Sequence, residues 1–561
     1  IGNKAFFGCS NLKSLIFIET PEGQTPVDLV ILDTPNGSSD NGYTNSPFYG
    51  CTSLKNIVLP ERLTVIGRLA FGGLVSGRYG EKYIPPFESI SLPSTLKEIH
   101  EMAFLNARNL KTVTFASGTT LSDACDGKAF AIGKQAFYYC TSLTEIALPT
   151  SSEATYSIGD TAFAYTGLKE ISIPKAVGWL GSGVFNRSSD LAKAVFEAGA
   201  NPKCGTSLFA YTAVSGVTLP EGVEAISDYM FQGCVNLTSV TVPASVKSIG
   251  ISAFESCQAL AKVTFATYEK DGKSYSNLIS IDNYAFSKTG ITSFTFPTLE
   301  GTKTLDLGNS LFRSCMKLET VGLSESVAEI GTAFADCFSI RSFVVDENNE
   351  NFSSKPGSPI LYNATGTAYM YICGQLPAGE YVIPEGIVSI GDNVFKGQVG
   401  ITKVVIPRSM QTIGNYAFSG CTLLETVVFE HSTDKPSQLT QKDSYGTNMF
   451  RECTSLKDVT LPANMTAIPA NMFYGCKALE SIVIPYGVTS IGQDAFGYAG
   501  LKSVSIPATV QTIANYAFEA RRDEGTIASL TFEKEADGST ALKTIGNVAF
   551  KYQCFPTFPM V

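Results

Sequence analysis

The stretch DYMFQGCVNLTSVTVPASVKSIG, residues 228–250, runs directly into ISAFESCQALAKVTF, residues 251–265, and the second stretch repeats the first. Both share one hydrophobic pattern, the position of a phenylalanine and of a cysteine, and a leucine three residues after the cysteine. Self-similarity at a short fixed period is the sequence signature of solenoids and other repeat arrays. The repeat unit therefore decides the fold of this chain.

The unit can be aligned on the phenylalanine of an Ala-Phe-like dipeptide, and the consensus is I-G-x-x-A-F-x-x-C-x-x-L-x-x-V-x-L-P-x-x-V-x-x. Most anchors are 22 to 24 residues apart, several 32 or 33, and the widest gaps are 42 and 61 residues. The twenty anchors are Phe6, Phe48, Phe71, Phe104, Phe137, Phe163, Phe185, Phe209, Phe231, Phe254, Phe286, Phe312, Phe334, Phe395, Phe418, Phe450, Phe473, Phe496, Phe518 and Phe550. A chain of 561 residues exceeds the size of one compact core, so these units should form an array.

The second half of each unit predicts a strand that ends at a proline, followed by a shorter strand. Val240 and Val242 are two residues apart, which is the strand period, and they are β-branched. Pro243 offers no N–H to a ladder, so the strand should end there. The V-x-x-I segment that follows predicts a second, shorter extended piece.

The residue four positions before each anchor predicts what lies between the strands. It is glycine in thirteen units, and otherwise Thr44, Ser227, Asp282, His100, Ile330, Pro469 or Ala514. Proline cannot adopt a positive φ, which argues against a general need for left-handed backbone at this position. Glycine, serine, threonine and aspartate are preferred helix N-caps, so we predict one short helical turn across x-x-A-F-x-x-C.

One coil alone buries too little apolar surface to offset the entropy of ordering its backbone. Stacking in parallel, about 4.8 Å per coil, would join the strands of successive coils into a continuous sheet and place each phenylalanine beneath the next. The repeat therefore predicts an elongated solenoid of about twenty coils.

This pattern resembles the BspA-type class of leucine-rich repeat, over essentially the whole chain. The resemblance implies an α/β repeat solenoid: a right-handed coil stack with a parallel β-sheet on its concave face, mostly strand and loop with short helical turns. We expect one solenoid over residues 1–561, with an atypical hairpin-like repeat variant at residues 344–391. Members of this class act mostly as bacterial surface adhesins.

The resemblance also implies a function, namely extracellular, non-enzymatic binding of protein partners such as host extracellular-matrix proteins or innate receptors. The alternative that we keep open is an accessory subunit of an outer-membrane surface lipoprotein complex. The chain itself shows neither a signal segment nor an anchor.

Composition and motifs limit the other classes of function. A net charge of −10, without basic runs, disfavours nucleic acid, and no apolar run approaches the length of a transmembrane segment. Of two histidines, His100 occupies a repeat position and His431 lies in a loop, and no H-E-x-x-H or G-x-S-x-G motif occurs. We therefore expect no enzyme, no cofactor and no metal site.

Ten of the fourteen cysteines follow an anchor by three residues: Cys9, Cys51, Cys140, Cys234, Cys257, Cys315, Cys337, Cys421, Cys453 and Cys476. Their spacing would permit disulfides, but side chains of one column point the same way. Other coils fill this position with small residues such as Ser188 or Thr212. We expect free, buried thiols.

Two surfaces are the candidate binding sites. The outward-facing strand positions form a face of small residues, represented by Thr241, Thr264 and Thr295. Insertions after the strand should emerge along one edge, where binding residues concentrate on a rigid scaffold. Their candidate contact residues are Tyr268, Lys270, Lys273, Tyr275 and Tyr445.

Overall fold

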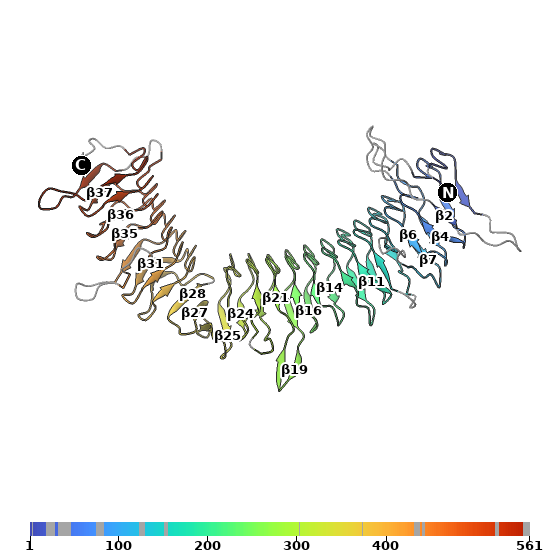
Figure 1. Ribbon diagram of the computed structural model, residues 1–561, viewed down its shortest axis with the longest axis horizontal. Helices are drawn as coiled ribbons and strands as arrows, with labels where there is room; N and C mark the ends of the chain where they lie inside the picture. The colour runs from blue at the N-terminus through green and yellow to red at the C-terminus, as the bar shows by residue number, and fades with distance from the viewer. Residues whose placement is uncertain are drawn as a thin grey trace. The chain divides into compact units, whose positions relative to one another are not determined.

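The computed structural model divides into two compact units. Figure 1 shows the stacked coils of the chain, coloured by residue number. Unit 1 comprises Ile1–Leu318 and Ser326–Cys337, and unit 2 comprises Glu319–Glu325 and Phe338–Val561. The structure describes residues 1–2, 4–17, 29–31, 46–73, 83–122, 130–150, 155–301, 303–372, 374–430, 438–439, 444–521 and 527–553.

Most coils of unit 1 contribute two strands, one to a series of parallel sheets of longer strands and one to a series of parallel sheets of shorter strands. The longer strands are β1 (Ser14–Ile16), β3 (Asn56–Val58), β5 (Ser89–Leu92), β7 (Thr112–Phe115), β8 (Glu145–Ile146), β10 (Glu170–Ile173), β12 (Lys193–Phe196), β14 (Gly216–Thr218), β16 (Ser239–Val242), β18 (Lys262–Phe265) and β22 (Ser293–Thr295). The shorter strands are β2 (Leu29–Ile31), β4 (Leu63–Ile66), β6 (Glu98–Ile99), β9 (Tyr156–Ile158), β11 (Val177–Leu180), β13 (Lys203–Cys204), β15 (Ala225–Ile226), β17 (Ser248–Ile249), β21 (Ser280–Ile281) and β23 (Asp306–Leu307). Val240 pairs with Val217 on one side and Val263 on the other, so equivalent positions of successive coils are in register.

Unit 2 repeats this arrangement. Its longer strands are β24 (Thr320–Leu323), β25 (Ser342–Val345), β29 (Gly379–Val382), β31 (Ile401–Ile406), β33 (Thr426–Phe429), β34 (Asp458–Thr460), β37 (Ser503–Ile506) and β39 (Ser529–Phe532). Its shorter strands are β30 (Ser389–Ile390), β32 (Thr412–Ile413), β35 (Ala467–Ile468), β36 (Ser490–Ile491), β38 (Thr512–Ile513) and β40 (Thr544–Ile545). The two predicted strands of the repeat unit are thus both present.

Residues 344–391 depart from the ordinary coil. Here β26 (Phe352–Ser354), β27 (Ile360–Asn363) and β28 (Ala368–Ile372) pair antiparallel in succession. β28 then pairs in parallel with β30, which returns the chain to the coil pattern. The segment therefore inserts a three-stranded meander that continues the ladder of shorter strands.

The anchor phenylalanines form one uninterrupted stack in each unit. From Phe6 to Phe334 in unit 1, neighbouring rings lie 4.9 to 5.8 Å apart between centroids, with interplanar angles of 15° or less. From Phe395 to Phe550 in unit 2 the spacing is 4.7 to 5.7 Å. The fold is a parallel-strand β-solenoid of about 18 turns, slightly fewer than the predicted number of about twenty coils. That the sheet lines a concave face stays a prediction.

The predicted helical turn at each anchor is wrong, since the described residues contain no α-helix. In the coil of Phe137, the N–H groups of Ala136 and Tyr138 bond within the turn, to carbonyls three residues back. The N–H of Phe137 instead donates 2.8 Å to Ala162 O of the next coil. Gln135 and Tyr139, two residues before and after the anchor, have φ of 56° and 62°. This alternation of local and inter-coil bonds, with left-handed residues between them, is incompatible with a helix.

The glycine before each anchor has a different role from the predicted cap. At Gly133, a Cβ atom would lie 2.5 Å from the backbone nitrogen of Glu101 in the preceding coil. At Gly159 it would lie 2.6 Å from the nitrogen of Lys134. Glycine is favoured because the backbones of successive coils approach closely at this point.

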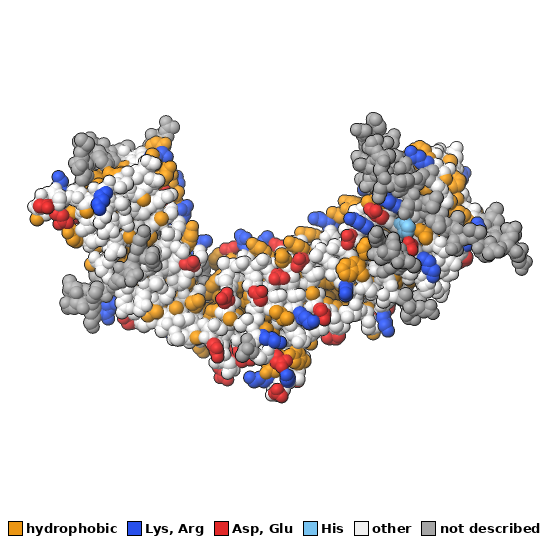
Figure 2. Space-filling view, in the orientation of Figure 1, with side chains coloured by type: hydrophobic (Ala, Val, Ile, Leu, Met, Phe, Trp, Pro, Cys, Tyr) orange, Lys and Arg blue, Asp and Glu red, His pale blue; other side chains and the backbone are white. Residues whose placement is uncertain are grey.

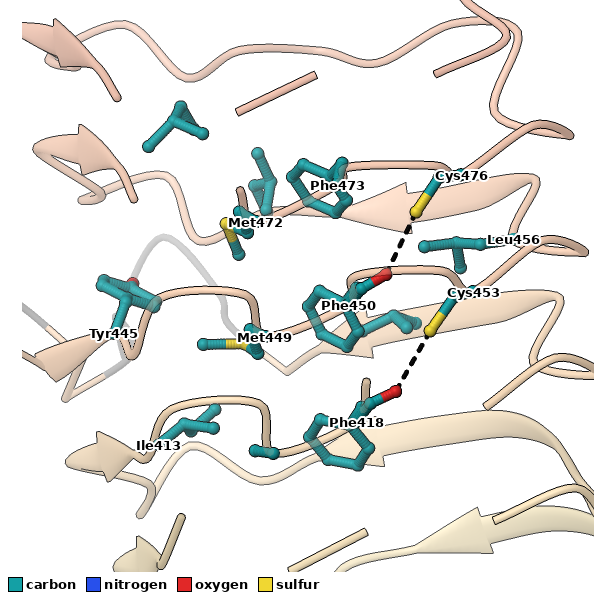
Figure 3. Packing of buried hydrophobic residues seen from close by; sticks show 14 of the residues in the cluster. Ile413, Phe418, Tyr445, Met449, Phe450, Cys453, Leu456, Met472, Phe473 and Cys476 are labelled. Carbon is teal, nitrogen blue, oxygen red and sulfur yellow. Dashed lines mark hydrogen bonds between the residues drawn. The ribbon is translucent and has the colours of Figure 1, made fainter. Parts of the chain in front are cut away.

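The cysteine column adds a second inter-coil ladder. Figure 3 shows the thiols of Cys453 and Cys476 donating to the carbonyl oxygens of Phe418 and Phe450, at 3.1 and 3.2 Å. Ser188 uses its hydroxyl in the same way, toward Phe163 O at 2.9 Å. Each of the ten column cysteines is a free thiol, nine of them buried. The position therefore favours a small buried side chain, and the thiols and Ser188 add a hydrogen bond to a neighbouring coil.

Candidate functional site

A hairpin projects from the coils of unit 1 directly after β18 (Figure 1). Its strands β19 (Tyr268–Lys270) and β20 (Lys273–Tyr275) pair antiparallel. The connection is Asp271-Gly272, with φ of 51° and 75°, as a two-residue type I′ turn requires. Ser276 N donates 2.9 Å to Thr298 O, which fixes the base of the hairpin to the next coil.

Four predicted contact residues share one face of this hairpin. Tyr268 is opposite Tyr275, and Lys270 is opposite Lys273. Directly opposed residues of an antiparallel pair project from the same side, so two aromatic and two basic side chains lie together. The Tyr268 and Tyr275 rings are 6.1 Å apart between centroids. Figure 2 shows basic, acidic and hydrophobic side chains gathered on this projection.

Glu300, from the loop that follows β22, neutralises half of this charge. Its carboxylate accepts hydrogen bonds from the Lys270 ammonium and, at 2.9 Å, from the Tyr268 hydroxyl. The bond from Lys270 holds the pKa of Glu300 below its usual value, and the same bond raises the pKa of Lys270. No motif or spacing in the sequence indicates that Glu300 belongs to this site.

Lys273 differs from Lys270, since it has no ion-pair partner within the described part of the chain. It is exposed beside the half-buried ring of Tyr275. The opposite face of the hairpin carries Glu269 and Ser274, whose side chains hydrogen-bond to each other. One face of the hairpin thus offers the Lys273 ammonium and the Tyr268 and Tyr275 rings. On the other face, the polar groups of Glu269 and Ser274 bond to each other.

The outward positions of the longer strands form the second surface. Thr241 of β16 pairs with Thr264 of β18, and Thr295 lies on β22; all three side chains are exposed. Ion pairs cross the same face, for example Lys193 to Glu170 at 3.2 Å. Both partners are largely exposed, so the pair contributes little to stability.

The face is hollowed near β7, β8, β10 and β12, where a depression of about 660 Å³ opens outward. Its lining combines the small residues Ala147 and Ser172 with Phe115, Glu145 and Val195. The hollow is large enough to receive a side chain of a binding partner, beside the carboxylate of Glu145.

Tyr445, in contrast, does not contribute to the accessible surface. Its side chain is 5% exposed, and its hydroxyl donates 2.9 Å to Leu439 O. It pairs with Ile413 of the preceding coil, in the position that isoleucine occupies in most coils (Figure 3). The ring therefore belongs to the core, and most of the loop at residues 430–446 lies outside the described residues.

Groups that could perform catalysis are sparse. His100 Nε2 lies 2.9 Å from Glu98 Oε2 in a repeat position. Throughout the described ranges, His, Cys, Asp and Glu side chains form no cluster that could hold a metal ion. Burial raises the pKa of Cys140 to about 12 and of Cys234 to about 11, which keeps these thiols protonated and unreactive.

Stacked coils with two series of parallel sheets, stacked phenylalanines and an inserted hairpin define a leucine-rich-repeat-like β-solenoid. The model of the BspA-type leucine-rich repeat region matches residues 38–79, 81–125, 126–234, 226–356 and 388–524, which is well over half of the chain. The protein belongs to the BspA-type leucine-rich repeat family. Among described residues, no helix is long and apolar enough to span a membrane.

Solved structures with this kind of fold come from several bacteria. A leucine-rich cell surface protein of Faecalibacterium prausnitzii is 22% identical, with 70% of this chain and 89% of that chain covered and a TM-score of 0.37. A leucine-rich repeat protein of Bacteroides ovatus is 22% identical, with 80% and 83% covered and a TM-score of 0.38. One of Eubacterium ventriosum is 23% identical, with 51% and 83% covered and a TM-score of 0.39. No curated protein matches the chain.

Proposed function

We propose that this protein is a non-enzymatic, adhesin-like protein of the bacterial cell surface that binds extracellular protein partners. The β19–β20 hairpin and the outward face of the longer strands would make the contacts. Host extracellular-matrix proteins are the partner class that we put forward first. Membership of the BspA-type family supports a protein-binding surface role.

The observation that carries the proposal is the one-sided hairpin. Tyrosine side chains on an exposed face are typical of the residues that anchor protein interfaces, and the lysines beside them supply charge that can complement an acidic partner surface. Glu300 pre-orders Tyr268 and Lys270, so less side-chain entropy is lost on binding. Lys273 remains available for a carboxylate of the partner.

The test measures binding of the purified chain to a panel of immobilised extracellular-matrix proteins by surface plasmon resonance. We expect saturable binding to at least one of them. The double variant Lys273→Ala/Tyr275→Ala should weaken that binding about tenfold or more, as truncation of interface anchors does.

The matched control changes the other face of the same hairpin, Glu269→Ala/Ser274→Ala, and should bind as the natural protein does. Equal binding by both double variants would exclude the hairpin as the contact surface. Failure to bind any matrix protein, combined with purification from its native membrane in a fixed ratio with another protein, would favour the outer-membrane accessory subunit instead.

A further inference from the structure

A second surface lies on the anchor turns of unit 1, at the position two residues after each anchor phenylalanine. This position has left-handed backbone, with φ between 57° and 62° at Tyr139, Tyr165, Arg187 and Tyr211. Several coils use glycine here, which adopts such a φ without steric cost: Gly8, Gly50, Gly233, Gly397, Gly420 and Gly475. Four consecutive coils therefore place large side chains on left-handed backbone, which is strained for these residues and would not be strained for glycine.

Those large side chains stack into a ladder that runs across the coils. The rings of Tyr139 and Tyr165 are parallel, 4.4 Å apart between centroids. The Arg187 guanidinium lies 5.9 Å from the Tyr165 centroid and 4.6 Å from that of Tyr211. At the far end, the Tyr211 ring covers Gly233, where a Cβ would lie 2.5 Å from the ring. Arg108 closes the near end, 5.5 Å from the centroid of Tyr139.

Arg187 is the central residue of this ladder. Its guanidinium lies over the ring of Tyr165 in one neighbouring coil and over the ring of Tyr211 in the other, so cation–π contacts hold the group in place. The residue is exposed, and it makes no ion pair with any described acidic side chain. Cation–π contacts use none of the N–H donors of the guanidinium, so these stay available to a ligand, and their planar fork matches a carboxylate in bidentate geometry.

The same combination recurs in unit 2. Arg451 lies 4.0 Å from the ring centroid of Tyr474, which packs edge-on against Tyr498 at 5.2 Å. Arg521 lies 5.9 Å from the centroid of Tyr498. Arginine and tyrosine thus also stack on the anchor turns of unit 2, although Arg451 and Tyr474 lie one residue after their anchors and not two.

We propose that the ladder of Arg108, Tyr139, Tyr165, Arg187 and Tyr211 binds an acidic peptide segment of a protein partner, with Arg187 donating two hydrogen bonds to one of its carboxylates. The tyrosine edges supply the apolar contact area that accompanies arginine at protein interfaces. The chain as a whole is acidic, with a net charge of −10, so attraction of an acidic peptide requires a local cationic site.

The probe is a fluorescently labelled peptide of alternating glutamate and tyrosine, titrated with the full chain at about 0.15 M ionic strength and followed by fluorescence anisotropy. We expect saturable binding that Arg187→Gly weakens about tenfold or more. Arg187→Lys, which retains the charge without the planar fork, should recover only part of that loss. Glycine is the natural occupant of this position in other coils, so the Arg187→Gly chain should retain its melting temperature.

The matched control is Lys288→Gly, which removes one positive charge at the same position of another coil, where Lys288 pairs with Glu255 at 3.7 Å. It should leave peptide binding unchanged. Absence of saturable binding, or an equal loss in the Lys288→Gly chain, would overturn the proposal. Binding of a sulfated polysaccharide that depends on Arg187, without binding of the peptide, would also overturn it. The hairpin variant Lys273→Ala/Tyr275→Ala should bind the peptide normally, so failure of the matrix-binding role and failure of this one are distinguishable.

Discussion

The buried thiols make the stability of the coils depend on pH. The pKa of Cys140 is raised from 9.0 to about 12 because its side chain is fully buried. Above pH 9 the unfolded chain loses this proton while the folded chain keeps it, so the free energy of unfolding falls as pH rises toward 12. We expect the loss to reach about 1.4 kcal/mol per pH unit for each such cysteine.

Urea denaturation of the natural protein and of Cys140→Ser between pH 8 and 11 measures this contribution. Serine should keep the bond that Cys140 makes to Phe104 O at 3.2 Å, as Ser188 does in its own coil. The variant should therefore lose less stability with rising pH. An identical pH dependence would contradict the assigned pKa.

The close approach of successive backbones at Gly133 predicts a second residue-scale effect. Gly133→Ala places a Cβ 2.5 Å from Glu101 N, and because this neighbour is backbone, the coils must separate. We expect a loss of about 1–3 kcal/mol in the free energy of unfolding by urea denaturation.

Gly216→Ala is the control, since a Cβ at Gly216 would meet nothing within 4 Å and the residue has no positive φ. Its stability should be unchanged or slightly raised. A Gly133→Ala chain as stable as this control would show that inter-coil distance is not what selects glycine there.

Two residue-level predictions from the sequence had opposite outcomes: the strand at Val240 and Val242 is present, whereas Tyr445 is not a surface residue. The period of two at Val240 and Val242 predicted the strand because side-chain alternation follows directly from backbone geometry. Tyr445 was predicted to be a surface contact because it follows a long insertion, although it is five residues before Phe450, where Ile413 stands before Phe418. Alignment on the anchor alone could have placed it in the core.

At the scale of the element, the β19–β20 hairpin depends on its two-residue turn. Gly272→Val puts a β-branched side chain at φ of 75°, a backbone region that such residues avoid. We expect the hairpin to open more often, by about 1–3 kcal/mol, with faster amide hydrogen exchange over residues 266–277.

Gly272→Asn is the matched variant, because asparagine tolerates left-handed backbone and should preserve protection. Exchange in the neighbouring coil strands β16 and β18 should be the same in both chains. If Gly272→Val exchanged no faster than Gly272→Asn over the hairpin, the turn would not control its stability.

The conformation of the anchor turn was predicted least well from the sequence. Small residues such as Gly, Ser, Thr and Asp are common at helix N-caps and also where two backbones approach closely. The residue types four positions before the anchor therefore did not distinguish a helix N-cap from a close backbone approach. Left-handed φ at Gln135 and Tyr139 also has no signal in those residues themselves. Most of the tyrosine–arginine ladder could have been found from the sequence, because all of its members except Arg108 share one position with glycines of other coils.

At the scale of the whole molecule, stability should be a sum of local terms. Each coil contacts mainly the coil before and the coil after it, so unfolding of a solenoid spreads through nearest neighbours. In the phenylalanine stacks from Phe6 to Phe334 and from Phe395 to Phe550, each anchor ring likewise stacks on the anchor rings directly before and after it. Removal of one ring should therefore lower the local stability of the neighbouring coils and leave distant coils unchanged.

Phe163→Ala tests that expectation. Phe163 is fully buried, 5.1 Å from the ring of Phe137 and 5.8 Å from that of Phe185, and its removal should cost about 3–5 kcal/mol locally. Hydrogen exchange should then accelerate most in the coils of Phe137, Phe163 and Phe185, and remain unchanged around Phe473. Phe473→Ala, in unit 2, should give the reverse pattern. Uniform acceleration along the chain in either variant would show a single cooperative unit and contradict nearest-neighbour stabilisation.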